Sequence, residues 1–368
     1  MGGTPKLNLV QVVSSSATSG AERHVFALSR RLSTLGHAVE VLSPDGGWLT
    51  SDLQQVGIPA HTTEMKGVGW FRTVAYLMRL FRSQRTDVVH THLTRATYFG
   101  VVAGMLSRVP VVATVHIANH DQIYKRMARG RNRLVAVSNY VRGMLHGRGI
   151  NDRYIDTVYN GTDFVDFEVE PPSSVKAELG IQPERRLIGL VGRVCREKGH
   201  MLMIEAMRDI AGEHPDAHLL FVGRVTRDVR PEIDEAVADA GLSGRVTLTG
   251  NRHDVPRILD ALEFSTMPSQ IETFGLAAIE AMARGKAVVA SRVGGLPEVV
   301  RHQQTGLLVD LRPHELAEAV DYLLTHEHER ARMGAAGRRI VEEKFTLERM
   351  ARQLEGVYAR AAGLESGR

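Results

Sequence analysis

The sequence predicts an α/β protein with two domains, each built on a doubly wound parallel sheet. Short apolar runs of strand length alternate with helical stretches along the whole chain, which is the rhythm of βαβ units. The chain has 368 residues, of which 43% are hydrophobic, so it can form two cores. Its composition changes near residues 160–172, where the turn signal Asn160-Gly161-Thr162-Asp163 precedes an acidic stretch that contains proline.

The first half begins with a buried-strand pattern at residues 7–13, followed by a small serine-rich loop that ends at Gly20. A helix is expected from residue 21 to residue 35. Five further strands are expected at residues 37–42, 87–91, 109–115, 133–137 and 154–158. No Gly-x-Gly-x-x-Gly fingerprint and no Walker A sequence occurs, which disfavours nicotinamide binding and P-loop chemistry.

The second half repeats the alternation of strands and helices. Strands are expected at residues 187–191, 218–222, 246–249, 263–267 and 287–290, and helices follow from residue 314 onward. We therefore expect one domain over residues 1–165, a second over residues 166–345, and a final helix over residues 346–368.

Composition and charge exclude several classes of function. The formal net charge of +4 is too small to indicate nucleic-acid binding, and it fits an anionic small molecule or an anionic membrane surface better. The single cysteine, Cys195, excludes a disulfide framework and is expected to be a small core residue. No apolar run approaches the ~20 residues of a membrane span, and the first residues do not resemble a signal peptide, so a cytoplasmic location is expected.

Residues 65–85 combine an apolar stripe with several arginines. The favoured interpretation is a helix that packs this stripe on the sheet. The alternative is that Trp70 and Phe71, beside basic residues, contact a bilayer surface. Residues 124–133 add five positive charges, which fits peripheral contact with an anionic membrane.

Histidines and cations follow several predicted strands, at the edge where ligands of parallel sheets bind. His90, His92 and His116 fall at strand ends of the first half, although any one of them can be purely structural. Arg193 and Lys198 follow the first strand of the second half and can neutralise a diphosphate there. The alternative is that both cations are solvated surface residues.

Residues 269–285 carry the most informative pattern. A helix is expected to begin near Phe274 and to end at Gly285, directly after a strand and Pro268. Such a helix start gathers unpaired N–H groups and the positive end of the dipole, which suits a phosphate group. From their spacing alone, the favoured interpretation is that Glu272 is a partner of the helix dipole and that Glu280 lies on a solvated helix face.

Two segments resemble a known family. VGRVCREKG around Arg193, and SQIETFGLAAIEAMARG with Glu272 and Glu280, are similar to motifs of the retaining glycosyltransferases of family GT4. The resemblance covers nearly the whole chain, although the first half matches in outline only. It implies the GT-B fold, in which two Rossmann-like domains face each other across a cleft and the last helix returns to the first domain.

The resemblance also implies how a nucleotide-diphosphate sugar is bound. Arg193 and Lys198 would clamp the diphosphate, and the backbone amides of Phe274, Gly275 and Leu276 would meet it at the start of the helix.

On the sugar side, the resemblance implies that Glu272 contacts hydroxyls of the donor sugar and that Glu280 holds the ribose hydroxyls. His116, which closes the strand VVATV, would contact the sugar near the reacting carbon. Gly20 would let the backbone approach the diphosphate.

The expected function is therefore a metal-independent retaining glycosyl transfer from a UDP- or GDP-linked sugar to an acceptor such as a glycolipid or cell-envelope glycan precursor. No Asp-x-Asp motif for a metal occurs, and neither a metal site nor a cofactor is expected. A nucleotide-sugar epimerase and a non-catalytic sugar-nucleotide-binding subunit are the alternatives. Because no opposing carboxylate nucleophile is evident, front-face attack assisted by the leaving phosphate is the favoured mechanism.

Overall fold

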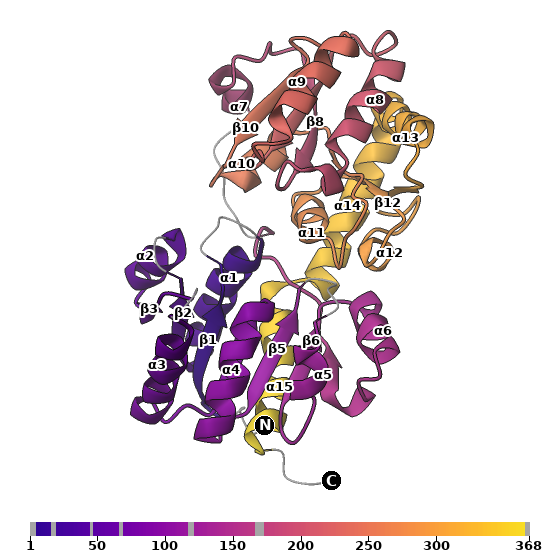
Figure 1. Cartoon of the computed structure of the whole chain (residues 1–368). Coiled ribbons are helices and arrows are strands. Elements are labelled where there is room, and N and C mark those ends of the chain that lie inside the picture. Colours follow the sequence, from indigo (N-terminus) through magenta and orange to yellow (C-terminus); the bar gives the residue numbers. More distant parts are fainter. Residues whose placement is uncertain are drawn as a thin grey trace. The chain divides into compact units, whose positions relative to one another are not determined.

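The computed structural model describes residues 5–15, 20–44, 47–65, 69–116, 121–165 and 173–364. The chain divides into two compact units, residues 1–160 with 347–368, and residues 161–346. Each unit is a parallel sheet covered by helices, so the predicted fold class is confirmed (Figure 1). Among the described residues, no helix combines the length and the apolar character needed to span a bilayer.

The first unit contains a seven-stranded parallel sheet in the order β3-β2-β1-β4-β5-β6-β7. Its strands are β1 (Asn8–Val13), β2 (Ala38–Ser43), β3 (Ala60–Thr62), β4 (Val88–His92), β5 (Val111–Val115), β6 (Arg133–Ala136) and β7 (Ile155–Thr157). Its helices are α1 (Gly20–Thr34), α2 (Trp48–Gln55), α3 (Gly69–Ser83), α4 (Thr94–Ser107), α5 (Ile123–Met127), α6 (Asn139–Gly147) and α15 (Leu347–Ala362), with a short 3₁₀ turn η1 (Asp152–Tyr154).

The central strands of this sheet are covered on both faces. Every residue of β4 and of β5 is buried, as expected for parallel strands that have helices on either side. From β1 the chain builds β2 and β3 on one side and then crosses to β4 on the other. The strand order therefore reverses between β1 and β4, and the carboxyl ends of these two strands form the switch point of the first unit.

Helix α15 belongs to the first unit although it ends the chain (Figure 1, yellow). The Tyr358 hydroxyl is 2.7 Å from Nδ1 of His90, in the middle of the central strand β4. Glu355 Oε1 accepts a hydrogen bond of 2.9 Å from Nε2 of His37, whose Nδ1 accepts the N–H of Leu7. These buried hydrogen bonds hold α15 on the sheet, although α15 lies far from His37 and His90 in the sequence.

The second unit contains a six-stranded parallel sheet in the order β10-β9-β8-β11-β12-β13. Its strands are β8 (Arg186–Val191), β9 (Ala217–Val222), β10 (Val246–Gly250), β11 (Phe264–Met267), β12 (Val288–Ser291) and β13 (Gly306–Val309). Its helices are α7 (Ser173–Glu178), α8 (His200–Ile210), α9 (Arg230–Asp239), α10 (Val255–Ala261), α11 (Leu276–Ala283), α12 (Leu296–Val299), α13 (Pro313–Thr325) and α14 (Glu327–Lys344). Its strand order reverses between β8 and β11, so the switch point lies at their carboxyl ends.

The boundary between the units differs from the expected one. It lies at 160/161 instead of 165/166, and the second unit ends at residue 346. The physical reason is that this segment hydrogen-bonds to the second unit: the Thr162 N–H donates to the Phe345 carbonyl at 2.9 Å, and Arg284 donates to the Phe164 carbonyl at 2.9 Å.

Two local expectations are corrected, and a third falls largely outside the described residues. The edge strands β3 and β13 were not expected, because runs of three and four residues are too short to stand out from loops. Helix α11 begins at Leu276 rather than near Phe274, because Gly275 before it has a left-handed φ of +109°. Most of the expected serine-rich loop, residues 16–19, lies outside the described residues.

The helix predicted within residues 65–85 is α3, and its apolar stripe packs inward as favoured: Val74, Leu77 and Phe81 are buried. Phe71, however, is 73% exposed. Cys195 is buried, as expected for a small core residue.

We predict that Tyr358→Phe destabilises the chain. The change keeps the ring and leaves the buried Nδ1 of His90 without its partner, which costs about 1–3 kcal/mol. Urea unfolding should show the lower free energy of unfolding. Tyr154→Phe is the matched control, because the Tyr154 hydroxyl accepts an exposed bond from Arg153 and its loss should leave the midpoint unchanged. Equal midpoints for Tyr358→Phe and the unmodified chain would contradict this role of α15.

Candidate active site

Lys198 and Glu272 form an ion pair at the switch point of the second sheet. The Lys198 ammonium donates to Glu272 Oε2 at 2.7 Å. Lys198 ends the 3₁₀ turn η2 (Arg196–Lys198) that follows β8, and Glu272 lies between β11 and α11. The pair therefore stands where ligands of open α/β sheets bind.

The loops that carry this pair are tied together through their backbones. The Gln270 N–H donates to the Glu197 carbonyl at 2.8 Å. Gly199 has a φ of +77°, and a Cβ there would lie 2.0 Å from the carbonyl oxygen of Pro268. Because no side chain fits at Gly199, glycine is what lets the loop after β8 approach the loop after β11.

A third loop, after β12, fixes the other side of Glu272. The Gly295 N–H donates to the Glu272 carbonyl at 3.0 Å, and a Cβ at Gly295 would lie 2.3 Å from the carbonyl oxygen of Thr273. The Ser291 hydroxyl donates to the Ser269 carbonyl at 2.6 Å. The backbone around Glu272 is thus held from two neighbouring loops.

The turn before α11 directs backbone N–H groups toward negative charge. Glu272 Oε1 accepts the N–H of Thr273 at 3.1 Å and that of Phe274 at 3.5 Å. Gly275 then caps α11 in the left-handed conformation, and the Phe274 ring packs edge-on against Phe345. Since these N–H groups stand at the positive end of the α11 dipole, the turn stabilises an anion.

The structure also describes the other site residues that were predicted in this unit. Glu280 is 8% exposed, which contradicts the interpretation that it belongs to a solvated helix face. Leu276 is the first residue of α11. Of the two predicted cations, Lys198 contacts Glu272, whereas Arg193 is exposed and interacts with Cys195 and Glu197. Their roles toward a donor stay predictions.

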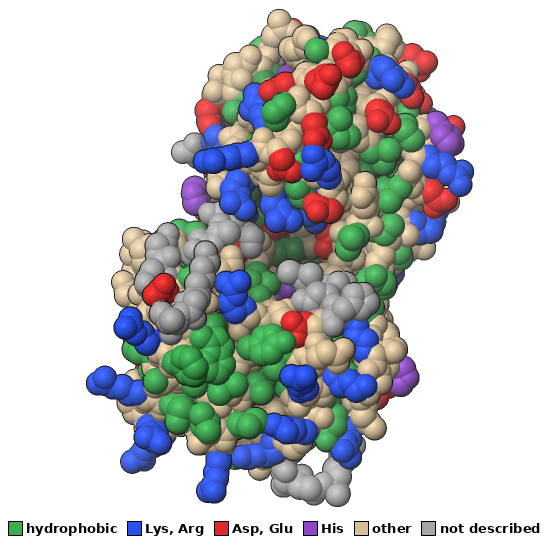
Figure 2. Space-filling model, viewed as in Figure 1, with side chains coloured by type: hydrophobic (Ala, Val, Ile, Leu, Met, Phe, Trp, Pro, Cys, Tyr) green, Lys and Arg blue, Asp and Glu red, His purple; other side chains and the backbone are tan. Residues whose placement is uncertain are grey.

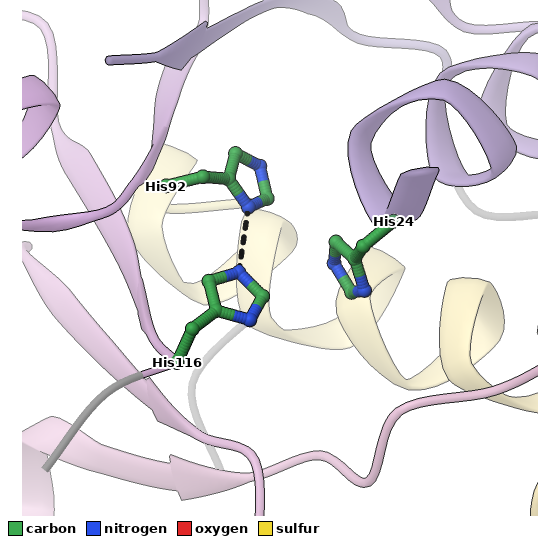
Figure 3. Close-up of side chains that lie close together, drawn as sticks. All are labelled: His24, His92 and His116. Atoms are coloured by element: carbon green, nitrogen blue, oxygen red, sulfur yellow. Dashed lines mark hydrogen bonds between the residues drawn. The ribbon is translucent and has the colours of Figure 1, made fainter. Parts of the chain in front are cut away.

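Three histidines converge at the switch point of the first sheet (Figure 3). His24 lies near the start of α1, which Gly20 begins; His92 ends β4, and His116 follows β5. His92 Nδ1 and His116 Nε2 are 3.2 Å apart. The ring centroid of His24 is 5.3 Å from that of His92 and 4.9 Å from that of His116.

Burial keeps this cluster neutral. Burial lowers the pKa of His24 to about 4 and is also the main reason that the pKa values of His92 and His116 are held well below the ordinary range. Positive charge on one histidine further disfavours it on its neighbours. Near neutral pH all three rings are therefore uncharged imidazoles.

His90 has a structural role, which was one of the possibilities for each histidine at a strand end. Its two ring nitrogens each lie 2.7 Å from a hydroxyl oxygen, those of Tyr358 and Thr114. His92 and His116, in contrast, face each other and His24 (Figure 3).

His24 was not predicted from the sequence. The only signal was its place in the first helix, four positions after Gly20, where the helix start meets the same sheet edge as His92 and His116. Gln11, whose side-chain oxygen lies 3.0 Å from His92 Nε2, was not predicted either, because a glutamine within an apolar strand carries no motif.

Comparisons with known proteins identify relatives of this chain. Residues 173–340 match the family model described as Glycosyl transferases group 1, and residues 18–165 match the model described as Glycosyltransferase Family 4. The chain is 30% identical, over 316 residues, to alpha-maltose-1-phosphate synthase of Mycolicibacterium smegmatis, covering 76% of this chain and 80% of that protein. It is 32% identical to the lipopolysaccharide core biosynthesis mannosyltransferase LpsB of Rhizobium meliloti, covering 55% and 59%.

Solved structures share the fold. A glycosyltransferase from Rickettsia africae superposes with a TM-score of 0.87 at 22% identity, covering 98% of this chain and 100% of that one. Anabaena Alr3699/HepE in complex with UDP and glucose superposes with a TM-score of 0.85 at 22% identity, covering 95% and 98%. These findings lend no support to the epimerase alternative. The chain is a glycosyltransferase of the GT-B fold and belongs to family GT4.

Proposed function

We propose that this enzyme transfers a sugar from a nucleotide-diphosphate sugar to an acceptor with retention of configuration, and that it needs no metal ion to stabilise the leaving diphosphate. The observation that carries the proposal is the Lys198–Glu272 pair beside the N-terminus of α11. The likeness to a structure that holds UDP and glucose supports a sugar-nucleotide donor. UDP- and GDP-linked sugars are both candidates.

Donor binding would exchange the partner of Lys198. In the structure, the Lys198 ammonium donates to Glu272 at 2.7 Å. A diphosphate carries more negative charge than one carboxylate, so it attracts Lys198 and the amides of Phe274, Gly275 and Leu276. Glu272 is then released to accept hydrogen bonds from sugar hydroxyls. After the exchange Lys198 is paired with the diphosphate and Glu272 is hydrogen-bonded to sugar hydroxyls, which limits the cost of the exchange.

Further groups complete the donor site in this proposal. Arg193 adds a second positive charge with the planar donor set that suits phosphate oxygens. The carboxylate of Glu280, which is buried in α11, accepts hydrogen bonds from the ribose hydroxyls. His116 contacts the sugar near the reacting carbon as a neutral imidazole, which does not oppose the positive charge that develops on the sugar. Gly20 gives the backbone room near the diphosphate.

The chemistry then rests on charge stabilisation. Negative charge grows on the diphosphate as the bond from the anomeric carbon to the phosphate oxygen breaks, and Lys198, Arg193 and the α11 amides stabilise it. The acceptor hydroxyl attacks from the same face and passes its proton to the leaving phosphate. Magnetic resonance of the first-formed product tests retention. An inverted glycosyl azide formed by Glu272→Ala in azide would indicate a covalent path instead.

Removing Lys198 should abolish most of the turnover. We predict that Lys198→Ala lowers the rate of slow donor hydrolysis by about 100- to 1,000-fold, the usual loss for one group that stabilises transition-state charge. Glu272→Ala should lower it as well. The readout is release of free nucleotide diphosphate, with the donor chosen by thermal shift against UDP, GDP and ADP.

Arg196→Ala is the matched control, because this neighbouring cation is exposed and pairs with Asp228 and Glu232. Its turnover should equal that of the unmodified enzyme. Unchanged turnover in both Lys198→Ala and Glu272→Ala would refute the proposed site.

Turnover should survive removal of metal ions. We predict that excess EDTA leaves donor hydrolysis unchanged. Lys198, Arg193 and the α11 amides would supply the positive charge that a divalent ion supplies in metal-dependent enzymes. A loss of activity in EDTA that Mg²⁺ or Mn²⁺ restores would show that the diphosphate is held through a metal.

We also propose that the acceptor is a glycolipid or cell-envelope glycan precursor, and that helices α3 and α4 contact an anionic membrane. Phe71, Met105 and Leu106 on these helices are 73%, 58% and 60% exposed. Figure 2 shows hydrophobic side chains gathered over α3 and α4 with Lys and Arg side chains around them. Arg79 and Arg82 line a hollow of 480 Å³ on α3, which suits a lipid phosphate.

If α3 contacts the membrane, Phe71→Ser should weaken vesicle binding. Partition into phosphatidylglycerol vesicles should fall by about tenfold or more, because burial of a phenylalanine contributes about 1.5–3 kcal/mol. Co-sedimentation measures it. Val56→Ser, which removes an exposed apolar side chain from the end of α2, should partition like the unmodified enzyme. Equal binding to neutral and anionic vesicles, or none to either, would contradict this proposal.

A further inference from the structure

His24, His92 and His116, called here the histidine trio, have the separations of ligands around one metal ion. Their candidate ligand atoms all lie within 4.8 Å of one another. A tetrahedral zinc ion with Zn–N bonds of about 2.0–2.1 Å holds its ligand nitrogens about 3.3 Å apart. His92 Nδ1 and His116 Nε2, at 3.2 Å, already stand at that separation.

Gln11 fixes the tautomer that His92 needs as a ligand. The Gln11 amide nitrogen donates to the Ser29 hydroxyl at 2.7 Å, and its carbonyl oxygen lies 3.0 Å from His92 Nε2. Since this oxygen only accepts, His92 Nε2 carries the proton and Nδ1 has the lone pair. A histidine whose second ring nitrogen donates to a carbonyl is the usual arrangement at metal sites.

His24 supplies a buried nitrogen whose hydrogen-bonding capacity is unused. Its side chain is 7% exposed, and no hydrogen-bond partner for its Nε2 exists among the residues that the structure describes. In Figure 3 the His24 ring faces the other two imidazoles.

We propose that the histidine trio binds one transition-metal ion of the zinc class, with Zn²⁺ as the first candidate. Three imidazoles suit this class of ion, and three protein ligands leave a fourth position for water. Binding replaces the shared hydrogen bond between His92 and His116. The proton on His116 Nε2 moves to its Nδ1 through solvent, so both rings stay neutral.

Metal binding would inhibit the enzyme. This consequence rests on the proposed function, in which His116 contacts the donor sugar. A zinc ion on His116 Nε2 withdraws this group from the sugar, so zinc and donor compete.

The test is metal binding to the full chain after treatment with a chelator. Calorimetry with Zn²⁺ should show one ion per chain, and Co²⁺ should give the intense visible absorption of a tetrahedral site. His24→Gln should weaken Zn²⁺ binding by at least about tenfold, and His24→Phe should do so as well. Circular dichroism verifies that at least one of the two variants folds.

The matched control is His214→Asn, because His214 lies with Glu213 and Asp321 in the other group of suitable ligands among the described residues. Its Zn²⁺ affinity should equal that of the unmodified chain. Absence of Zn²⁺ binding, equal affinity in a folded His24 variant, or loss of binding in His214→Asn would overturn the proposal.

Donor binding separates this inference from the proposed function. Donor affinity measured in chelator tests the proposed function alone. Zn²⁺ at a concentration near its Kd for the unmodified enzyme should then weaken donor binding to that enzyme and have a clearly smaller effect in His24→Gln. Donor binding that is unaffected by Zn²⁺ in the unmodified enzyme would refute the competition.

Discussion

The ion pair between Lys198 and Glu272 is the interaction on which the account of the second unit depends. The pair is partly buried, so removing either side chain would leave a charge that water solvates poorly. Three loops hold it, and glycines at positions 199 and 295 allow them to approach where any side chain would collide with a carbonyl oxygen. Close backbone packing thus surrounds one charged pair, which is consistent with a preorganised site for a charged ligand.

The two units use their switch points in opposite electrostatic ways. In the second unit a lysine, a carboxylate and the start of α11 form a charged site. In the first unit, burial suppresses charge on His24, His92 and His116, and the carbonyl oxygen of Gln11 accepts the Nε2 proton of His92. A charged site suits a diphosphate, whereas a neutral imidazole cluster suits a sugar or a soft metal ion.

Much of the fold followed from the sequence because the strands of a covered parallel sheet are continuous apolar runs. The edge strands β3 and β13 did not, since short runs give no periodicity. Motifs indicated Lys198 and Glu272 separately, but their contact joins positions 74 residues apart and depends on loop packing that no local pattern encodes. His24 is a similar case, because it lies on α1 and its relevance comes from His92 at the end of β4 and His116 after β5.

A crystal structure of the enzyme with a bound nucleoside diphosphate, grown in EDTA, tests the central claim most directly. The account predicts Lys198 Nζ on a phosphate oxygen, the amides at the start of α11 on the same group, and Glu272 released from Lys198. A nucleotide bound elsewhere while Lys198 stays on Glu272 would contradict it.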